Sequence, residues 1–323
     1  MSHIKSGSIM VAALVLATAT ACASPNPEAE EPDSGEVVSL EVGSIPGLPS
    51  QFLQFGIDQG YFLDEGLELS ISLQQSGAAT IPAVMGEHLD FGTSNVAAVI
   101  QARAQGLPIV VFGGGTISGD DPLNDLGAVV VPVDSPVQTL ADLEGSTIAV
   151  NALGGIADLS IRIALEEQGV DPMAVNFFEI GFPDMVATLA ADQVEAASLL
   201  EPFVSLAKNA GNRVIASGFY RPGLVIGSIF TSENYADANP DIVERFQRAV
   251  AVTTDAVNDD DGAAFREFLI GLKAFPAEVQ DMVVISQFAA EVDEQTLTEI
   301  ADAMTRFGFI DSPPSADEIL WHP

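Results

Sequence analysis

Two stretches of equal length, residues 85–106 and 190–211, follow the same plan. Each contains a helix end, an acidic turn at Glu87 or Asp192, a short apolar strand, a second helix and a terminal glycine. The segments before them, a strand and then a helix, also match in kind, although few residues are identical. Repetition of one supersecondary unit restricts the fold strongly. We expect two similar lobes, and the alternative is a chance similarity between two α/β units.

Strand-like and helix-like segments alternate from Val37 onward. Strands are predicted by apolar runs such as VSLEVGSI, PIVVFGGG and GAVVVP, and helices by stretches such as SNVAAVIQARAQG. This order predicts an α/β fold with parallel sheets. After LVIGSIFT the pattern is helical to the end of the chain.

We further predict how the chain divides between the lobes. We expect lobe one to comprise residues 37–128 together with C-terminal helices at 225–323, and lobe two to comprise residues 129–224. Connections near GAVVVP and RPGLVIGS would form a hinge, where Gly223 and Gly227 supply backbone freedom.

The start of the chain has the pattern of an export signal. The apolar run IMVAALVLA is too short to span a bilayer, and small residues follow it up to Cys22, the single cysteine. This pattern resembles a bacterial lipoprotein signal, so we expect a signal peptide at 1–21 and a lipidated cysteine with a disordered tether at 22–36. An ordinary secretory peptide with an incidental cysteine is the alternative.

The charge balance is extreme, with 46 acidic residues against 11 basic ones and a net charge of −35. Nucleic acid is therefore not expected as a partner, because the chain lacks the basic patches that such binding requires. We interpret the acidic residues as a solvated surface. The run NDDDG at 258–262 lacks the ligand spacing of a calcium loop and predicts a turn between helices.

The sequence carries no recognisable catalytic motif. It lacks a usable cysteine nucleophile, a G-x-S-x-G elbow, a P-loop and an HExxH pair. Of the three histidines, His3 lies in the signal, His322 at the tail and His88 in a turn that should face solvent. We therefore expect no catalytic residues, no metal site and no cofactor.

Candidate ligand contacts gather where the predicted strands end. In open α/β sheets ligands bind beyond the carboxyl ends of the strands. Small polar residues stand there, including Ser44, Ser94 and Asn95, and the stretch ALGGIADLS places Gly154 and Gly155 at the start of a helix. Exposed N–H groups at such helix ends favour ligand atoms that accept hydrogen bonds. Ordinary turn chemistry is the alternative for each position.

Four motifs in order, DQGYFLDEGLELS, MGEHLDFGTSN, TLADLEGSTIAV and AASLLEPF, resemble the nitrate/sulfonate/taurine and thiamine-precursor family of ABC-transporter solute-binding proteins. The resemblance covers roughly residues 38–232. It implies a two-lobed periplasmic-binding-protein type 2 fold with two crossover segments, and a ligand in the cleft between the lobes. It also implies an extracytoplasmic monomer, tied to the membrane by its lipid, that docks on a permease and its ATPase.

By this resemblance, Ser94, Asn95, Gly154, Gly155 and Glu201 fall on segments that line the cleft in such proteins. Two other functions stay open. An enzyme of the same fold makes the thiamine pyrimidine, but it carries a cysteine-rich motif and an active-site histidine that have no counterpart here. A structural surface lipoprotein without a small ligand is the third possibility.

The residues near the expected cleft favour an organic ligand. Arg221 is the only basic residue that we place near the cleft, whereas Phe52, Phe182 and Phe203 lie near the starts of predicted helices on the cleft side. Packing in the core is the alternative for each ring. If the rings face the cleft, they would sandwich a flat ligand while Glu201 accepts a hydrogen bond from it. We therefore expect a heterocycle ahead of inorganic anions, with sulfonates also open.

Overall fold

The computed structural model describes residues 37–323. The predictions for the signal peptide, for Cys22 and for the tether lie outside the described residues. None of the helices found between residues 37 and 323 is long and apolar enough to cross a membrane.

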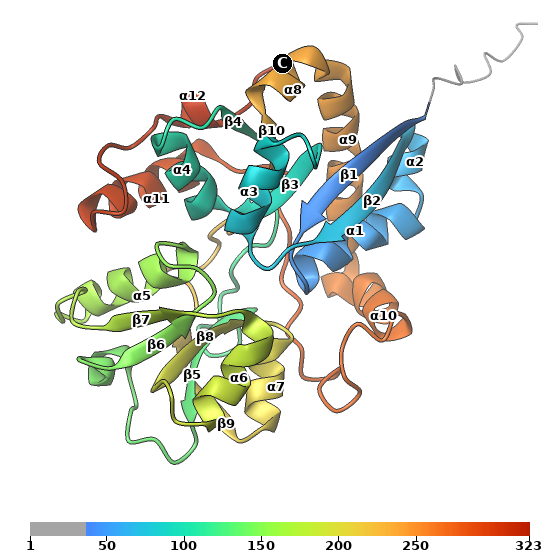
Figure 1. Ribbon diagram of the computed structural model, residues 1–323. Coiled ribbons are helices and arrows are strands. Elements are labelled where there is room, and N and C mark those ends of the chain that lie inside the picture. Colours follow the sequence, from blue (N-terminus) through green and yellow to red (C-terminus); the bar gives the residue numbers. More distant parts are fainter. Residues whose placement is uncertain (1–36) are drawn as a thin grey trace, which may run out of the picture. The chain divides into compact units, whose positions relative to one another are not determined.

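The first sheet contains five strands in the order β2-β1-β3-β10-β4 (Figure 1). Strand β1 pairs in parallel with β2 and with β3, whereas β10 runs antiparallel to β3 and to β4. The bounds are β1 Val38–Ser44, β2 Leu67–Leu73, β3 Phe91–Asn95, β4 Ile109–Gly113 and β10 Gly227–Ser232.

The second sheet has the equivalent order β7-β6-β8-β5-β9. Here β6 pairs in parallel with β7 and with β8, and β5 is the antiparallel strand between β8 and β9. The bounds are β5 Gly127–Pro132, β6 Thr147–Val150, β7 Asn176–Glu179, β8 Ala196–Leu200 and β9 Asn212–Ser217.

The α/β class is confirmed, but the expectation of purely parallel sheets is wrong. Each sheet has one strand that arrives from the other sheet: β5 follows β4 of the first sheet, and β10 follows β9 of the second. These two strands are antiparallel to their neighbours. Both strands are mostly buried, and a buried apolar run predicts a strand without predicting its direction.

The two connecting segments, residues 114–126 and 218–226, are the crossovers. They pair with each other through backbone hydrogen bonds from Ser118 N to Leu224 O at 2.9 Å and from Ile226 N to Thr116 O at 2.8 Å. Gly223 has a left-handed φ of 67°. Because the two segments lie side by side with hydrogen-bonded backbones, the crossovers have one defined geometry.

The predicted internal repeat is confirmed by the structure. Strands β3 and β8 take the same place in their sheets, and each follows an acidic residue with positive φ, 57° at Glu87 and 53° at Asp192. The two terminal glycines also match, with φ of 85° at Gly106 and 88° at Gly211. Such angles favour glycine, so an acidic residue there is a specific local feature that both units share.

Helices cover both faces of the first sheet. One apolar core joins the sheet to α1 Leu48–Asp58, α2 Tyr61–Asp64, α9 Pro240–Asn258 and α10 Ala263–Gly271. A second core joins it to α3 Gly77–Met85, α4 Val96–Ala104, α11 Glu294–Arg306 and α12 Ala316–Ile319. The short α8 Glu233–Ala238 follows β10. The C-terminal helices thus pack on the first sheet, as the resemblance implied.

The second sheet is also covered on both faces. Helices α6 Phe182–Ala190 and α7 Phe203–Asn209 share one core with it. Helix α5 Ile156–Glu167 and the 3₁₀ helix η1 Leu140–Leu143 share the other.

Helix α5 has two apolar faces. Ile161 and Leu165 pack toward the second sheet, whereas Ile156, Leu159 and Ile163 belong to the core that contains α4 and α11. Residues three and four apart lie on one helical face, so this spacing lets α5 contact both groups of elements.

The C-terminal part departs from the all-helical prediction. Residues 272–293, between α10 and α11, contain no helix. Pro276 interrupts any helical pattern there, because proline lacks the N–H that a helix interior uses. The run NDDDG is confirmed as a turn between helices: η2 Asp259–Gly262 separates α9 from α10. The exact lobe limits at residues 128/129 and 224/225 stay a prediction.

Candidate ligand-binding cavity

A cavity lies at the carboxyl ends of strands from both sheets. The first sheet lines it with residues 93–95 at the end of β3, 114–116 after β4 and 227–229 at the start of β10. The second sheet lines it with residues 198–200 at the end of β8 and with 218–219 after β9. This is the place where open α/β sheets bind ligands.

The centre of a water molecule can move through about 70 Å³ of this cavity. One water molecule needs about 10–15 Å³ on this measure, so the space equals that of roughly five to seven waters. Among the described residues that line the cavity, none carries a charged side chain. The cavity can therefore hold a small organic molecule, which it would surround with apolar groups, amides and hydroxyls.

Aromatic rings line the cavity from both sides. Phe52 of α1 stacks on Phe288, with ring centroids 4.5 Å apart and planes inclined by 14°, and both residues line the cavity. On the side of the second sheet, Phe182 and Phe219 line it, and Phe182 stacks on Phe203 at 5.9 Å. A ring backed by another ring is held in one orientation and presents a flat apolar face.

The polar groups of the lining include residues at the ends of β3 and β8 and in the first crossover, together with Asn151 after β6 and Ser228 in β10. Thr93 donates from Oγ1 to Ser44 Oγ at 2.9 Å. Ser94 is 7% exposed, and its Oγ has no hydrogen-bond partner in the described structure. Thr116 and Ser198 are buried and also line the cavity. Buried hydroxyls normally have partners, so Ser94 is a candidate for a ligand contact.

Three helices, α1, α5 and α6, begin at the cavity without a side-chain cap. Helix α5 starts after Gly155 and α6 after Gly181, and no side chain caps either N-terminus. Their first residues, Ile156 and Phe182, line the cavity. Unpaired N–H groups at such ends can donate to a carbonyl or ring nitrogen of a ligand.

Two glycines of the lining are required by close packing. A Cβ on Gly115 would lie 2.8 Å from Gly227 Cα, and a Cβ on Gly77 would lie 2.7 Å from Ser94 Cα. Gly227 has no positive φ, so its role is to permit this close approach. Gly223 has a φ of 67°, an angle that favours glycine, and a hinge at these two glycines stays a prediction. Side chains at these positions would push apart the segments that form the cavity.

The structure brings together four of the nine predicted ligand contacts. Phe52, Ser94, Asn95 and Phe182 line the cavity. Asn95 also caps α4, because its Oδ1 accepts a hydrogen bond from Ala98 N at 3.0 Å. Their contact with a ligand stays a prediction.

Three further predicted contacts lie behind the lining. Ser44 is fully buried and accepts from Thr93. Gly154 has a φ of 68° and donates from its N–H to Asp158 Oδ2 at 2.9 Å, while Gly155 serves as the N-cap of α5. The structure thus gives these three residues roles in shaping the ends of β1 and β6 near the cavity.

Glu201 is 3% exposed and is not part of the lining. Its carboxylate accepts hydrogen bonds from Ser205 Oγ at 2.9 Å, from Ser205 N at 3.1 Å and from Val284 N at 3.2 Å. Burial raises the pKa of this carboxyl, and the hydrogen bonds offset part of that rise. Glu201 therefore joins the end of β8 to the irregular segment between α10 and α11.

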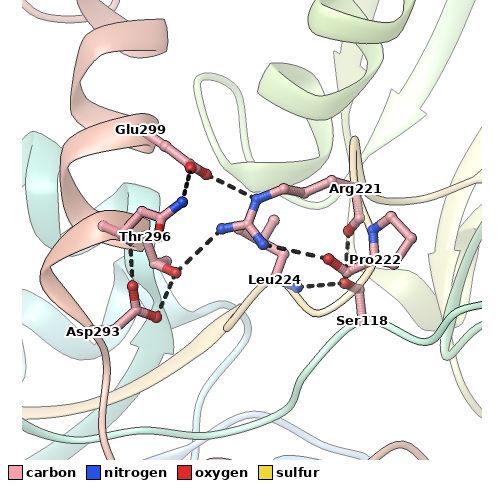
Figure 2. Close-up of polar contacts among 8 residues, drawn as sticks. Ser118, Arg221, Pro222, Leu224, Asp293, Thr296 and Glu299 are labelled. Atoms are coloured by element: carbon pink, nitrogen blue, oxygen red, sulfur yellow. Dashed lines mark hydrogen bonds and ion pairs between the residues drawn. The ribbon is translucent and has the colours of Figure 1, made fainter.

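Arg221 is not part of the cavity lining either, and Figure 2 shows its polar contacts with α11 and the first crossover. Its Nε donates to Glu299 Oε2 at 2.8 Å, and its Nη2 lies 3.5 Å from Thr296 Oγ1. The backbone oxygen of Arg221 accepts from Ser118 Oγ at 2.8 Å. The guanidinium thus ties the second crossover to α11, which explains the position of this arginine without a ligand.

Comparisons with known proteins agree with this architecture. A protein-family model described as NMT1/THI5 like matches residues 52–264, more than half of the chain. The chain belongs to the NMT1/THI5-like family.

Two curated proteins and a solved structure that are similar to this chain supply functional context. A Brachyspira hyodysenteriae protein named as an ABC transporter periplasmic binding protein is 25% identical over 250 residues, 73% of this chain and 70% of that protein. The riboflavin-binding protein RibY of Chloroflexus aurantiacus is 26% identical over 256 residues, with the same coverage of 73% and 70%. Among solved structures, the alkanesulfonate-binding protein SsuA of Xanthomonas axonopodis pv. citri bound to MOPS has a TM-score of 0.72 at 19% identity, over 88% of this chain and 97% of that one.

Several residues of the cavity were not among the predicted contacts. Phe219 follows β9 after Gly218, so the rule that ligands bind beyond strand ends could have identified it. Ser198 lies within the apolar run of β8, where a single serine gives no signal. Phe288 belongs to the irregular segment 272–293, whose path no sequence pattern of this NMT1/THI5-like chain predicts.

Proposed function

We propose that this chain is the solute-binding component of an ABC importer and captures a small organic molecule in the cavity between its two sheets. The observation that carries the proposal is the cavity itself, to which both sheets and both crossovers contribute residues. A ligand there would contact both halves of the chain, so its binding energy could favour a closed arrangement.

Relatives support this function. They include a protein named as an ABC transporter periplasmic binding protein and a riboflavin-binding protein. An alkanesulfonate-binding protein has a similar fold. We propose the same division of labour here: the chain binds its solute outside the cytoplasm as a monomer and delivers it to a permease that an ATPase drives.

We further propose that a lipid on Cys22 holds the chain at the membrane. The support is the sequence pattern of a short apolar run, small residues and one cysteine, followed by the polar stretch 23–36. Such a stretch would give the binding domain reach above the membrane surface.

Catalysis is not part of the proposal. Within residues 37–323, no group of three or more His, Cys, Asp and Glu side chains could hold a metal ion. The cavity lining offers hydroxyls and amides but no charged acid or base. Turnover of pyridoxal phosphate by the purified chain would favour the thiamine-pyrimidine-synthase-like alternative.

The test uses the purified full chain in detergent. It is incubated with deproteinised yeast extract, separated from unbound compounds by gel filtration, denatured, and analysed by mass spectrometry for enriched small molecules. The matched control is Ala157→Trp, because Ala157 lines the cavity and is only partly buried, so a large side chain there should fill the space. We expect enrichment with the wild-type chain and none with a folded Ala157→Trp. No enrichment with either chain would contradict solute capture.

A further inference from the structure

The cavity offers no counter-ion to a charged ligand. The nearest candidates from the sequence are already used: the Glu201 carboxylate accepts three internal hydrogen bonds, and Arg221 pairs with Glu299. A buried charge without a partner is costly, because the charge loses its hydration. An anion or a cation in this cavity would have to rely on hydroxyls and backbone groups alone.

The rings of the lining disfavour an anion further. The face of a phenylalanine ring carries the negative part of its quadrupole, and such faces attract flat rings and repel anions. Phe52 and Phe288 line the cavity beside the first sheet, and Phe182 and Phe219 line it beside the second. A flat ring could therefore stack against rings from both halves of the chain.

The helix N-termini argue for anions in principle, because their N–H groups form a positive end. Two of the three uncapped helices carry an acid in the first turn, Asp158 in α5 and Asp184 in α6. Helix α1 carries none, but its first turn contains Pro49, which has no N–H to donate. Asp158 also accepts the hydrogen bond from Gly154 N and pairs with Arg162 at 2.7 Å. These carboxylates offset the positive helix ends, so the N–H groups that remain suit a neutral acceptor better than an anion.

We infer that the ligand is an uncharged molecule with one or two flat rings, and that Ser94 bonds to its polar edge. The inference rests on the proposed function and names the class of its solute. The space of roughly five to seven waters limits the size to such molecules. Ser94 is selected because its Oγ is buried and has no partner in the described structure, while the residue lines the cavity. Thr116 and Ser198 add hydroxyls that can donate or accept.

The test uses pairs of ring compounds that differ in charge. Titration calorimetry at pH 7.5 compares uracil with orotate, nicotinamide with nicotinate, and benzenesulfonamide with benzenesulfonate, and nitrate is titrated alone. We expect an uncharged member to bind at least ~100-fold more tightly than its anionic partner, because the anion lacks a counter-ion. Equal or tighter binding of an anionic member, or of nitrate, would overturn the inference and leave solute capture standing. If no compound binds, and no small molecule is enriched from extract, both the inference and the proposal of solute capture are overturned.

Two serine variants test the role of Ser94 in the same titrations. Ser94 and Ser160 are both buried with unpartnered Oγ atoms, but Ser160 on α5 is not part of the lining. Ser94→Ala should weaken binding of the preferred uncharged compound by about 2- to 10-fold, the net value of one hydrogen bond. Ser160→Ala should leave it unchanged. Equal affinities of the two variants would overturn the assignment of Ser94, and melting curves establish that both fold.

Discussion

The close approach of the two crossovers makes Gly115→Ala a direct test of how the halves of the chain are joined. A Cβ at residue 115 would lie 2.8 Å from Gly227 Cα and 2.9 Å from Gly227 C, against 3.4–4 Å for ordinary contact. Both atoms belong to backbone, so no side-chain rotation relieves the clash. The segments must separate, although hydrogen bonds such as that from Ile226 N to Thr116 O hold them together.

The expected cost follows from overpacking of a well-packed site. Inserted methyl groups cost about 1–3 kcal/mol in free energy of unfolding, and a clash with backbone should fall within that range. Urea unfolding followed by far-ultraviolet circular dichroism measures it. The control is Gly271→Ala, because a Cβ at residue 271 of α10 meets nothing within 4 Å. Alanine in a helix should leave stability unchanged or raise it by up to about 1 kcal/mol.

A second variant examines the same contact from the other side. A Cβ on Gly227 would lie 3.0 Å from Gly115 Cα and from Thr116 N, so Gly227→Ala should also destabilise the chain. Because the two substitutions disturb one contact, the cost of the double variant should be less than the sum of the single costs. Equal free energies of unfolding for Gly115→Ala, Gly271→Ala and the unmodified chain would refute the reasoning.

Two further predictions concern Glu201 and Cys22. Burial raises the pKa of Glu201 above its ordinary 4.5, so folding favours the protonated carboxyl. The contribution of Glu201 to the free energy of unfolding is therefore fully present below pH 4.5 and is lost as pH rises through the higher folded-state pKa. In urea unfolding at a series of pH values, the stability of the unmodified chain relative to Glu201→Gln should therefore decline from pH 4 upward, and parallel profiles would count against this. Cys22→Ser should leave the chain unlipidated, so it should leave the membrane fraction on cell fractionation, whereas membrane retention equal to the unmodified chain would exclude the anchor.

The fold was largely predictable from sequence because its signals are local. The helix end, the acidic turn, the strand and the terminal glycine recur at equal spacing, and the structure repeats them down to the positive φ at Glu87 and Asp192. Strand direction is not a local property. The residues of β5 and β10 do not indicate that the chain has crossed from one sheet to the other before each strand. The antiparallel pairings of these strands could therefore not be predicted from the alternation.

The site was predicted only in part for a related reason. Strand ends and helix starts can be located in sequence, and Ser94, Asn95 and Phe182, which were selected in this way, line the cavity. Their contact with a ligand stays a prediction. Whether a polar side chain faces a ligand or the protein depends on partners that are distant in sequence. Glu201 accepts a hydrogen bond from Val284, 83 residues away, and Arg221 donates one to Glu299, 78 residues away.

The charged residues of this chain lie outside the cavity lining, and this bears on how the acidic composition relates to ligand binding. A net charge of −35 is the most extreme property of the sequence, yet the described residues that line the cavity carry no charged side chain. Exposed carboxylates are screened within about 8–10 Å at physiological ionic strength, so they affect solubility more than they affect a buried ligand. In the proposed site, selection among small ligands would depend on aromatic rings and hydroxyls. Such groups discriminate by shape and by single hydrogen bonds, so the net charge, which argues against nucleic acid, says little about which small ligand is selected.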